Sequence, residues 1–188
     1  MDDKLEVFVR QVRKRSRENE ESLRLLHREN LYANVVSILR QELDSLVRVI
    51  FLLSQADRVY RKALIAASVD GRPWTRKGGK RRITDREMVE LSVELSKDLS
   101  YWAKNVYEFG CAFIHLSSFH DYEKRDPMGS ISATERATIA SYLNKYHRVH
   151  LGPDVRFSEI LPLLPGVFDK ISNNLECYLK NLEEDGDL

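Results

Sequence analysis

The sequence predicts an all-α fold, a helical bundle of five to seven helices, and three observations favour this class. Neither proline nor glycine occurs before Gly71, so the first 70 residues can be helical with few interruptions. Apolar residues recur three and four positions apart, which is the period of an amphipathic helix. The alternation of apolar and polar residues that marks a half-buried strand is nowhere long enough to predict one.

Residues 1–28 are expected to form an N-terminal helical arm with a heptad-like stripe. Spaced alternately four and three residues apart, the stripe consists of Leu5, Val9, Val12, Ser16, Asn19, Leu23 and Leu26. Two polar positions in so short a stripe predict only a weak independent coiled coil. We therefore expect the arm to pack on the rest of the chain or on a second copy.

Residues 30–182 are expected to form the bundle, within a single domain spanning residues 1–188. The helices Val35–Ser54 and Leu99–Phe119 are the expected central pair, because much of each is apolar on nearly all sides. Residues 183–188 are expected to be a frayed acidic tail. The remaining expected helices cover residues 57–69, 85–95, 132–146 and, after Pro162 and Pro165, 167–182.

Local cap patterns place several of these boundaries. Thr84 followed by Glu87, and Ser132 followed by Glu135, are capping-box patterns, in which each side chain bonds a free backbone N–H of the other residue. Asn30 is the expected N-cap of the second helix, because a short amide side chain can accept from a free N–H of the first turn.

Composition restricts the location and the partners. The 30 basic and 29 acidic residues give a net charge of +1, so any affinity for nucleic acid must come from local clustering. The beginning of the chain is polar, and its apolar runs are far shorter than the roughly 20 residues of a membrane span. Cys111 and Cys177 lie in apolar helical contexts, and we interpret both as buried free thiols. These observations favour a cytoplasmic protein without membrane contact.

A basic loop follows the third expected helix. Six of the eleven residues from Arg72 to Arg82 are Lys or Arg, and Gly and Pro residues interrupt any helix here. Such a loop can bind phosphates, and an aromatic ring can add a stacking surface for bases. The candidate nucleic-acid-binding residues are Trp74, Arg76, Lys77, Lys80, Arg81 and Arg82. The alternative is an ordinary solvated loop.

A polar stripe in the apolar helix near residue 115 is the second candidate site. Lys104, Glu108, Cys111 and His115 recur at helical spacing among apolar and aromatic neighbours. Polar groups inside a core must be paired, so the stripe predicts either a pocket in which His115 moves a proton or a structural histidine.

Arg48 is the expected partner of that stripe, because it lies in the most apolar part of the second helix. A guanidinium there requires a carboxylate, which Asp44 or Glu108 could supply near His115. The alternative is a solvated ladder of charges along one helix edge. In an enzyme, His115 would be the general base, Arg48 would clamp a phosphate or an oxyanion, and Glu108 would orient the histidine.

The sequence predicts no metal site and no cofactor. The spacing of His115 and His120 differs from that of the histidine pair in zinc-binding helices, and no nucleotide-binding motif is present.

The apolar segment Phe113-Ile114-His115-Leu116-Ser117, preceded by a long helix with polar markers, resembles the HEPN superfamily of small helical bundles. The resemblance covers about residues 30–120. It implies a homodimer active in defence, stress or RNA processing, where many members cleave RNA with an Arg that is separated from a following His by four to six intervening residues. None of the five histidines has an Arg at that spacing. The resemblance therefore implies a noncatalytic module that binds RNA or a protein partner.

Two alternatives to that function remain at the level of the sequence. One is an enzyme that cleaves RNA or acts on another phosphate compound and uses His115. The other is an assembly protein that oligomerises through the arm of residues 1–28.

Overall fold

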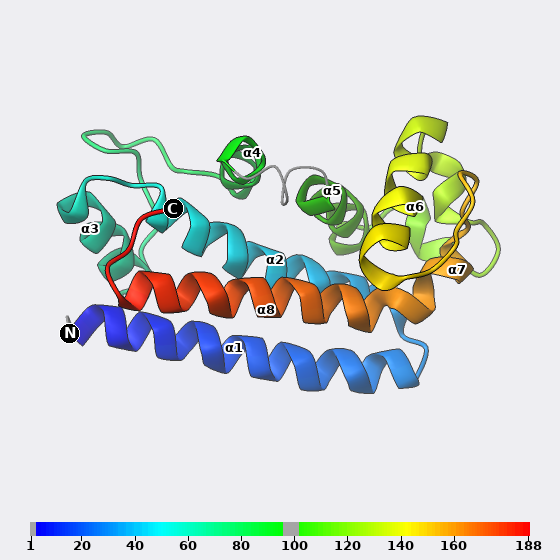
Figure 1. The fold of residues 1–188 in the computed structure, drawn as a ribbon, viewed down its shortest axis with the longest axis horizontal. Coiled ribbons are helices and arrows are strands. Elements are labelled where there is room, and N and C mark those ends of the chain that lie inside the picture. Colours follow the sequence, from blue (N-terminus) through cyan, green and yellow to red (C-terminus); the bar gives the residue numbers. More distant parts are fainter. Residues whose placement is uncertain (1–2, 96–101) are drawn as a thin grey trace.

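The computed structural model describes residues 3–95 and 102–188 and confirms the all-α fold class. Three long helices lie side by side: α1 (Asp3–Arg28), α2 (Tyr32–Leu53) and α8 (Leu164–Glu183) (Figure 1). The chain direction of α1 is opposite to that of α2 and α8. Within the described ranges, no helix is both long and apolar enough to span a membrane.

The N-terminal arm packs on the rest of the same chain. Val9 and Leu23 of its stripe are only 2% and 1% exposed, because they face the layer formed by α2 and α8. The two polar positions also have partners inside the chain. Ser16 and Asn19 donate hydrogen bonds to the Glu42 carboxylate over 2.5 and 2.9 Å. The heptad-like stripe is thus used within one copy of the chain.

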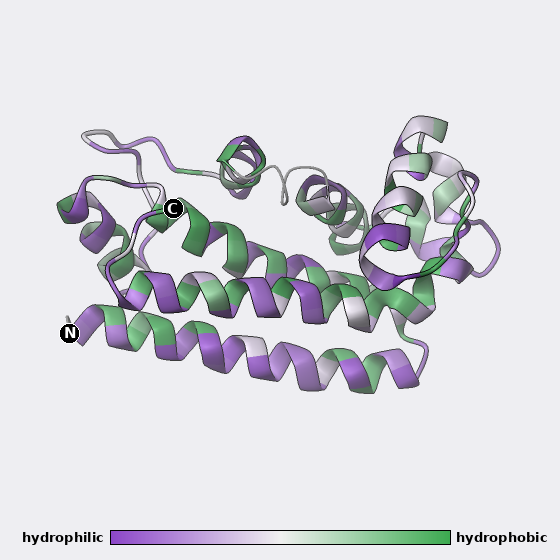
Figure 2. Cartoon of the chain, viewed as in Figure 1, coloured by the Kyte–Doolittle hydropathy of each residue, from purple (hydrophilic) through white to green (hydrophobic). Residues whose placement is uncertain are grey.

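Helix α2 is the centre of the molecule. On its other side lie α4 (Asp85–Leu95) and α5 (Trp102–Ile114), which Figure 1 shows nearly end-on, while α3 (Arg58–Val69) follows α2 in the chain. Figure 2 shows α2 largely hydrophobic, whereas α1 alternates hydrophilic and hydrophobic segments. The difference follows from position, since α2 is covered by α1, α4, α5 and α8.

Helix α5 ends five residues before the expected boundary at Phe119. The hydroxyl of Ser117 donates to the carbonyl oxygen of Ala112 over 2.7 Å and accepts from the N–H of Phe119 over 3.2 Å. These bonds end one helix and cap a 3-10 turn at Ser118–Asp121. The expected start at Leu99 lies outside the described residues.

The C-terminal elements are α6 (Ala133–His147), the single turn α7 (Phe157–Ile160) and α8. Helix α8 begins at Leu164, three residues before the expected start, and includes Pro165 in its first turn. Proline is tolerated there because the first N–H groups of a helix have no intrahelical acceptor.

The capping boxes are confirmed at both predicted places. Glu87 donates its N–H to the Thr84 hydroxyl over 3.2 Å, and its carboxylate accepts the N–H of Thr84 over 2.8 Å. Ser132 and Glu135 make the corresponding pair of bonds. The expected cap at Asn30 is wrong, because Asn30 adopts a left-handed φ of 60° in the connection between α1 and α2.

The two cysteines are free thiols, as expected, but the expectation that both are buried is wrong. Cys111 is half-buried on α5, and Cys177 is exposed on α8.

Candidate nucleic-acid interface

The basic hairpin, which we define as residues 72–82, is an ordered turn rather than a shapeless loop. Thr75 and Arg82 form an antiparallel bridge, and the N–H of Arg76 donates to the carbonyl oxygen of Arg81 over 2.9 Å. Gly78 closes the turn with a φ of +69°, a conformation that glycine adopts without strain. The hairpin leads from α3 to α4 at the edge of the molecule (Figure 1).

Two aromatic side chains, Tyr60 and Trp74, attach this hairpin to the helices. The hydroxyl of Tyr60 on α3 donates to the carbonyl oxygen of Thr75 over 2.7 Å. The indole N–H of Trp74 donates to the Ser68 hydroxyl over 2.8 Å, and its ring packs against Phe51. Trp74 is only 4% exposed, so the expectation that it offers a stacking surface for bases is wrong.

The remaining hairpin candidates are exposed cations, and their pairing divides them into two groups. Neighbouring carboxylates pair with four of the cations, in the ion pairs Arg72–Asp70, Arg76–Glu87, Arg81–Glu87 and Lys77–Asp57. Lys80 and Arg82 are exposed and have no carboxylate partner within residues 3–95 and 102–188. Three carboxylates therefore face six cations, and the hairpin keeps a positive excess.

Glu87 holds the base of the hairpin against α4. The backbone N–H of Thr84, and then the guanidinium of Arg76, lower the pKa of Glu87 from 4.5 to about 2. Glu87 is thus ionised throughout the neutral range and can keep its contacts with both hairpin arginines, Arg76 and Arg81.

Arg48 of α2 contacts both Trp74 of the hairpin and the first residue of α4. Its guanidinium lies 5.3 Å from the centre of the Trp74 ring and bonds Asp44 over 3.1 Å. It also bonds Asp85, the first residue of α4, over 2.7 Å. Of the two carboxylate partners expected for Arg48, Asp44 is therefore correct. The expected pairing with Glu108 is wrong, because Glu108 forms its ion pair with Lys104, 3.8 Å away on the same helix.

Arg40 and Asp85 complete this charged cluster, and the contribution of Asp85 was not expected from the sequence. The Arg40 side chain is 7% exposed, bonds Asp85 over 3.4 Å and lies 4.2 Å from the centre of the Tyr107 ring. The repeat of Arg40, Asp44 and Arg48 every four residues was visible in the sequence, but nothing local indicated that α4 supplies the second carboxylate.

The polar stripe of α5 faces outward instead of lining a core. The side chains of Lys104 and Glu108 are 61% and 46% exposed. His115 follows the last residue of α5 and is exposed, so it does not lie inside the core. Among the described residues, no hydrogen bond or ion pair joins any two of His115, Arg48 and Glu108. A catalytic role of these three residues remains a prediction from the sequence.

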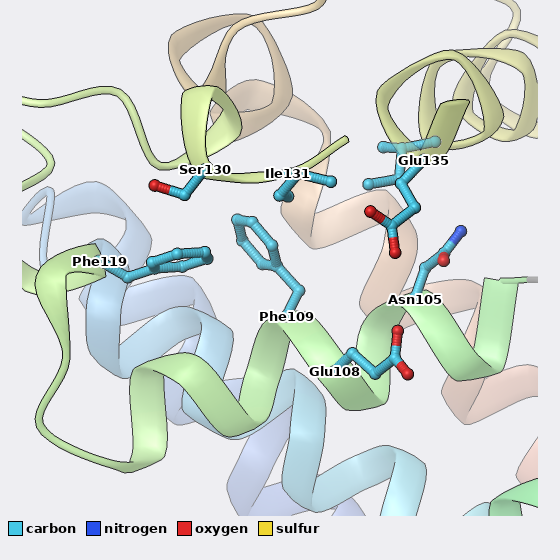
Figure 3. Close-up of a pocket in the computed structure, with 8 residues that line it drawn as sticks. Asn105, Glu108, Phe109, Phe119, Ser130, Ile131 and Glu135 are labelled. Atoms are coloured by element: carbon cyan, nitrogen blue, oxygen red, sulfur yellow. The ribbon is translucent and has the colours of Figure 1, made fainter. Parts of the chain in front are cut away.

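Glu108 instead lines a cavity of about 200 Å³ between α5 and α6 (Figure 3). Asn105 and Glu135 contribute the other long polar side chains of this cavity, and Phe109 and Phe119 contribute aromatic rings. Sequence reasoning missed the cavity because Glu135 had been explained fully by its cap.

Comparison with known proteins finds no family model, no curated protein and no solved structure that matches this chain. The candidate surfaces are therefore interpreted from their own geometry.

Proposed function

We propose that this protein is a noncatalytic, HEPN-like helical bundle that binds single-stranded RNA through the basic hairpin. The observation that carries the proposal is the positive excess of an exposed hairpin in which Lys80 and Arg82 lack a carboxylate partner among the described residues. Free cations on a surface can replace the counterions of a phosphate backbone, and the release of those counterions drives binding.

The burial of Trp74 supports one mode of binding over another. With the indole inside the core, the hairpin offers charge but no stacking platform. We therefore propose that the hairpin contacts phosphates and that binding has little sequence preference. The family resemblance adds a homodimer with a role in bacterial defence or stress to this proposal, and we also propose a cytoplasmic location.

The first test is the binding of a labelled single-stranded RNA oligonucleotide, followed by fluorescence anisotropy as the salt concentration increases. The double variant Lys80→Ala/Arg82→Ala should bind more weakly at every salt concentration. The slope of log affinity against log salt should decrease by about 1.4, because each lost phosphate contact removes about 0.7 for a single strand.

A matched control is Lys14→Ala/Arg17→Ala, which removes the same charge from two exposed positions of α1. This control should retain the wild-type slope. The proposal would be wrong if both double variants lost affinity equally, or if wild-type binding did not depend on salt. Light scattering of the wild-type protein tests the proposed homodimer separately.

A further inference from the structure

The cavity between α5 and α6 has two parts of different chemistry. The outer part, about 200 Å³ in volume, opens between the two helices and carries the polar groups shown in Figure 3. The inner part, about 90 Å³, is almost entirely apolar. Its side chains come from six parts of the chain and include Leu39, Val106, Met128, Leu143, Ile160 and Leu164.

Asn105, Phe109 and Ile139 line both parts, so the two spaces adjoin. A polar mouth beside an apolar interior is typical of sites for small amphipathic molecules. The combined space accepts one ring or a short alkyl chain with a polar end.

Asn105 lies where the two parts of the cavity meet, and its side-chain amide is an unsatisfied hydrogen-bond donor. Its Nδ2 atom is buried and has no hydrogen-bond partner among residues 3–95 and 102–188. A buried N–H without an acceptor costs about 1–3 kcal/mol, so an oxygen atom of a bound molecule would relieve this cost. The orphaned amide is a second feature that points to a ligand, independent of the charges at the mouth.

The charge of the side chains at the mouth of the cavity determines whether a cationic or an anionic ligand is favoured. Glu108 and Glu135 point toward each other from α5 and α6, with Asn105 beside them (Figure 3). Bonds from the Ser132 hydroxyl and then the Ser132 N–H lower the pKa of Glu135, so this carboxyl group stays ionised. Lys104 lies 3.8 Å from Glu108 and offsets one of the two negative charges. The remaining negative charge favours a cation and disfavours an anion.

We propose that this cavity binds a small amphipathic amino alcohol. The ammonium group lies between Glu108 and Glu135, and the hydroxyl oxygen accepts a hydrogen bond from the Asn105 amide. The apolar body fills the inner space beside Ile139. Each part of the ligand thus corresponds to one feature of the cavity, and the proposal is independent of RNA binding by the hairpin.

Isothermal titration calorimetry with three related probes tests the proposal. Phenylalaninol carries the ammonium, the hydroxyl and a phenyl ring, 2-phenylethylamine lacks the hydroxyl, and 3-phenylpropionate replaces the cation with an anion. We expect phenylalaninol to bind, phenylethylamine to bind about tenfold more weakly for the loss of one hydrogen bond, and phenylpropionate not to bind. Absence of phenylalaninol binding, or equal affinities of the two amines, would overturn the proposal.

Variants locate the binding site. Glu108→Gln and Glu135→Gln each remove one negative charge and should weaken phenylalaninol binding about tenfold. Glutamine at position 135 preserves the capping box, so α6 should remain folded. Glu123→Gln, at an exposed position outside the cavity lining, is the matched control and should bind as the wild type does.

A variant with a larger side chain tests whether the ligand occupies the inner space or binds at the surface. Ile139→Phe fills the boundary between the two parts of the cavity and should abolish binding while the helical circular dichroism spectrum is retained. Unchanged affinity in this folded variant would place any bound amine elsewhere and would overturn the proposal. If Ile139→Phe loses its helical signal, Ile139→Ala tests the apolar space instead. We expect Ile139→Ala to bind phenylalaninol more weakly than the wild type does. Unchanged affinity of Ile139→Ala would contradict the proposal.

Discussion

Glu42 is a carboxyl group with no exposed surface, held between α1 and α2. Burial raises its pKa above the ordinary value of 4.5, although hydrogen bonds from Ser16 and Asn19 act in the opposite direction. The folded state consequently binds a proton more tightly than the unfolded state does. The free energy of unfolding should therefore decrease as the pH rises from about 4.5 through the raised pKa of the folded state.

Replacing Glu42 with glutamine should remove this contribution, because the amide stays neutral at every pH. Above the raised pKa, Glu42→Gln should unfold at a higher urea concentration than the wild type, and the difference should grow with pH until Glu42 is fully ionised. Urea titrations at several pH values measure this difference. Glu21→Gln, at an exposed position of α1, should follow the wild type. Identical pH profiles of wild type and Glu42→Gln would contradict the prediction.

At the scale of helices, α2 and α5 approach each other closely at Gly110. A Cβ atom added at Gly110 would lie 2.6 Å from the Cβ atom of Arg40, which cannot move without moving α2. Gly110 is therefore required for the close approach of the two helices, and the same approach places Arg40 between Tyr107 and Asp85.

Gly110→Ala separates this steric effect from helix propensity. Alanine within a helix normally gains about 1 kcal/mol over glycine. Overpacking costs about 1–3 kcal/mol, so we expect a net loss of stability and a lower melting temperature. Gly129→Ala, where an added Cβ meets no heavy atom within 4 Å, is the control and should change stability little. A melting temperature of Gly110→Ala above that of the wild type would contradict the prediction.

Helix boundaries show which parts of this structure the sequence could predict. The caps at Thr84 and Ser132 involve residues three positions apart, so a local pattern was sufficient. The early end of α5 depends on Ser117 bonding backward to Ala112, which competes with a continuing apolar run. The bond from Arg48 to Asp85 spans 37 residues and depends on how α4 packs. Such contacts follow from the arrangement of the helices and leave no local signal.

The candidate sites also divide into features that a local sequence pattern predicts and features that depend on packing. The basic hairpin was visible because charge density is a local property of the sequence. The burial of Trp74 was not visible, since it depends on Phe51 and Ser68 from two other segments. The cavity at Asn105 required α5 and α6 to be placed together.

At the scale of the whole molecule, the N-terminal arm is part of the core rather than an appendage. Phe8, Val9 and Leu23 are almost fully buried, and Arg13 bonds both Glu176 and Glu183 of α8 over 2.7–3.0 Å. An arm used in this way stabilises the fold of a single chain, which makes its buried face a poor candidate for an assembly surface.

Two leucines of α1 provide a direct comparison. Leu23→Ala should lower the free energy of unfolding by about 2–5 kcal/mol, because the side chain is 1% exposed and leaves a cavity. Leu25→Ala, where the side chain is 53% exposed on the same helix, should change it by less than about 0.5 kcal/mol. Chemical denaturation measures both values. Similar values for the two variants would show that the arm does not pack on the bundle in solution.

The contact between α1 and α8 also bears on the order in which the molecule can form during synthesis. The bonded pair Arg13 and Glu183 lies 170 residues apart in the chain, so a ribosome completes α1 long before its partner exists. Until then, α1 can bury its apolar face against α2 and α3. Contacts between such distant segments slow folding, because a long loop must close before they form. The last step of folding should thus be the docking of α8 onto a waiting α1–α2 pair, and a nascent chain halted before α8 should expose that surface to chaperones.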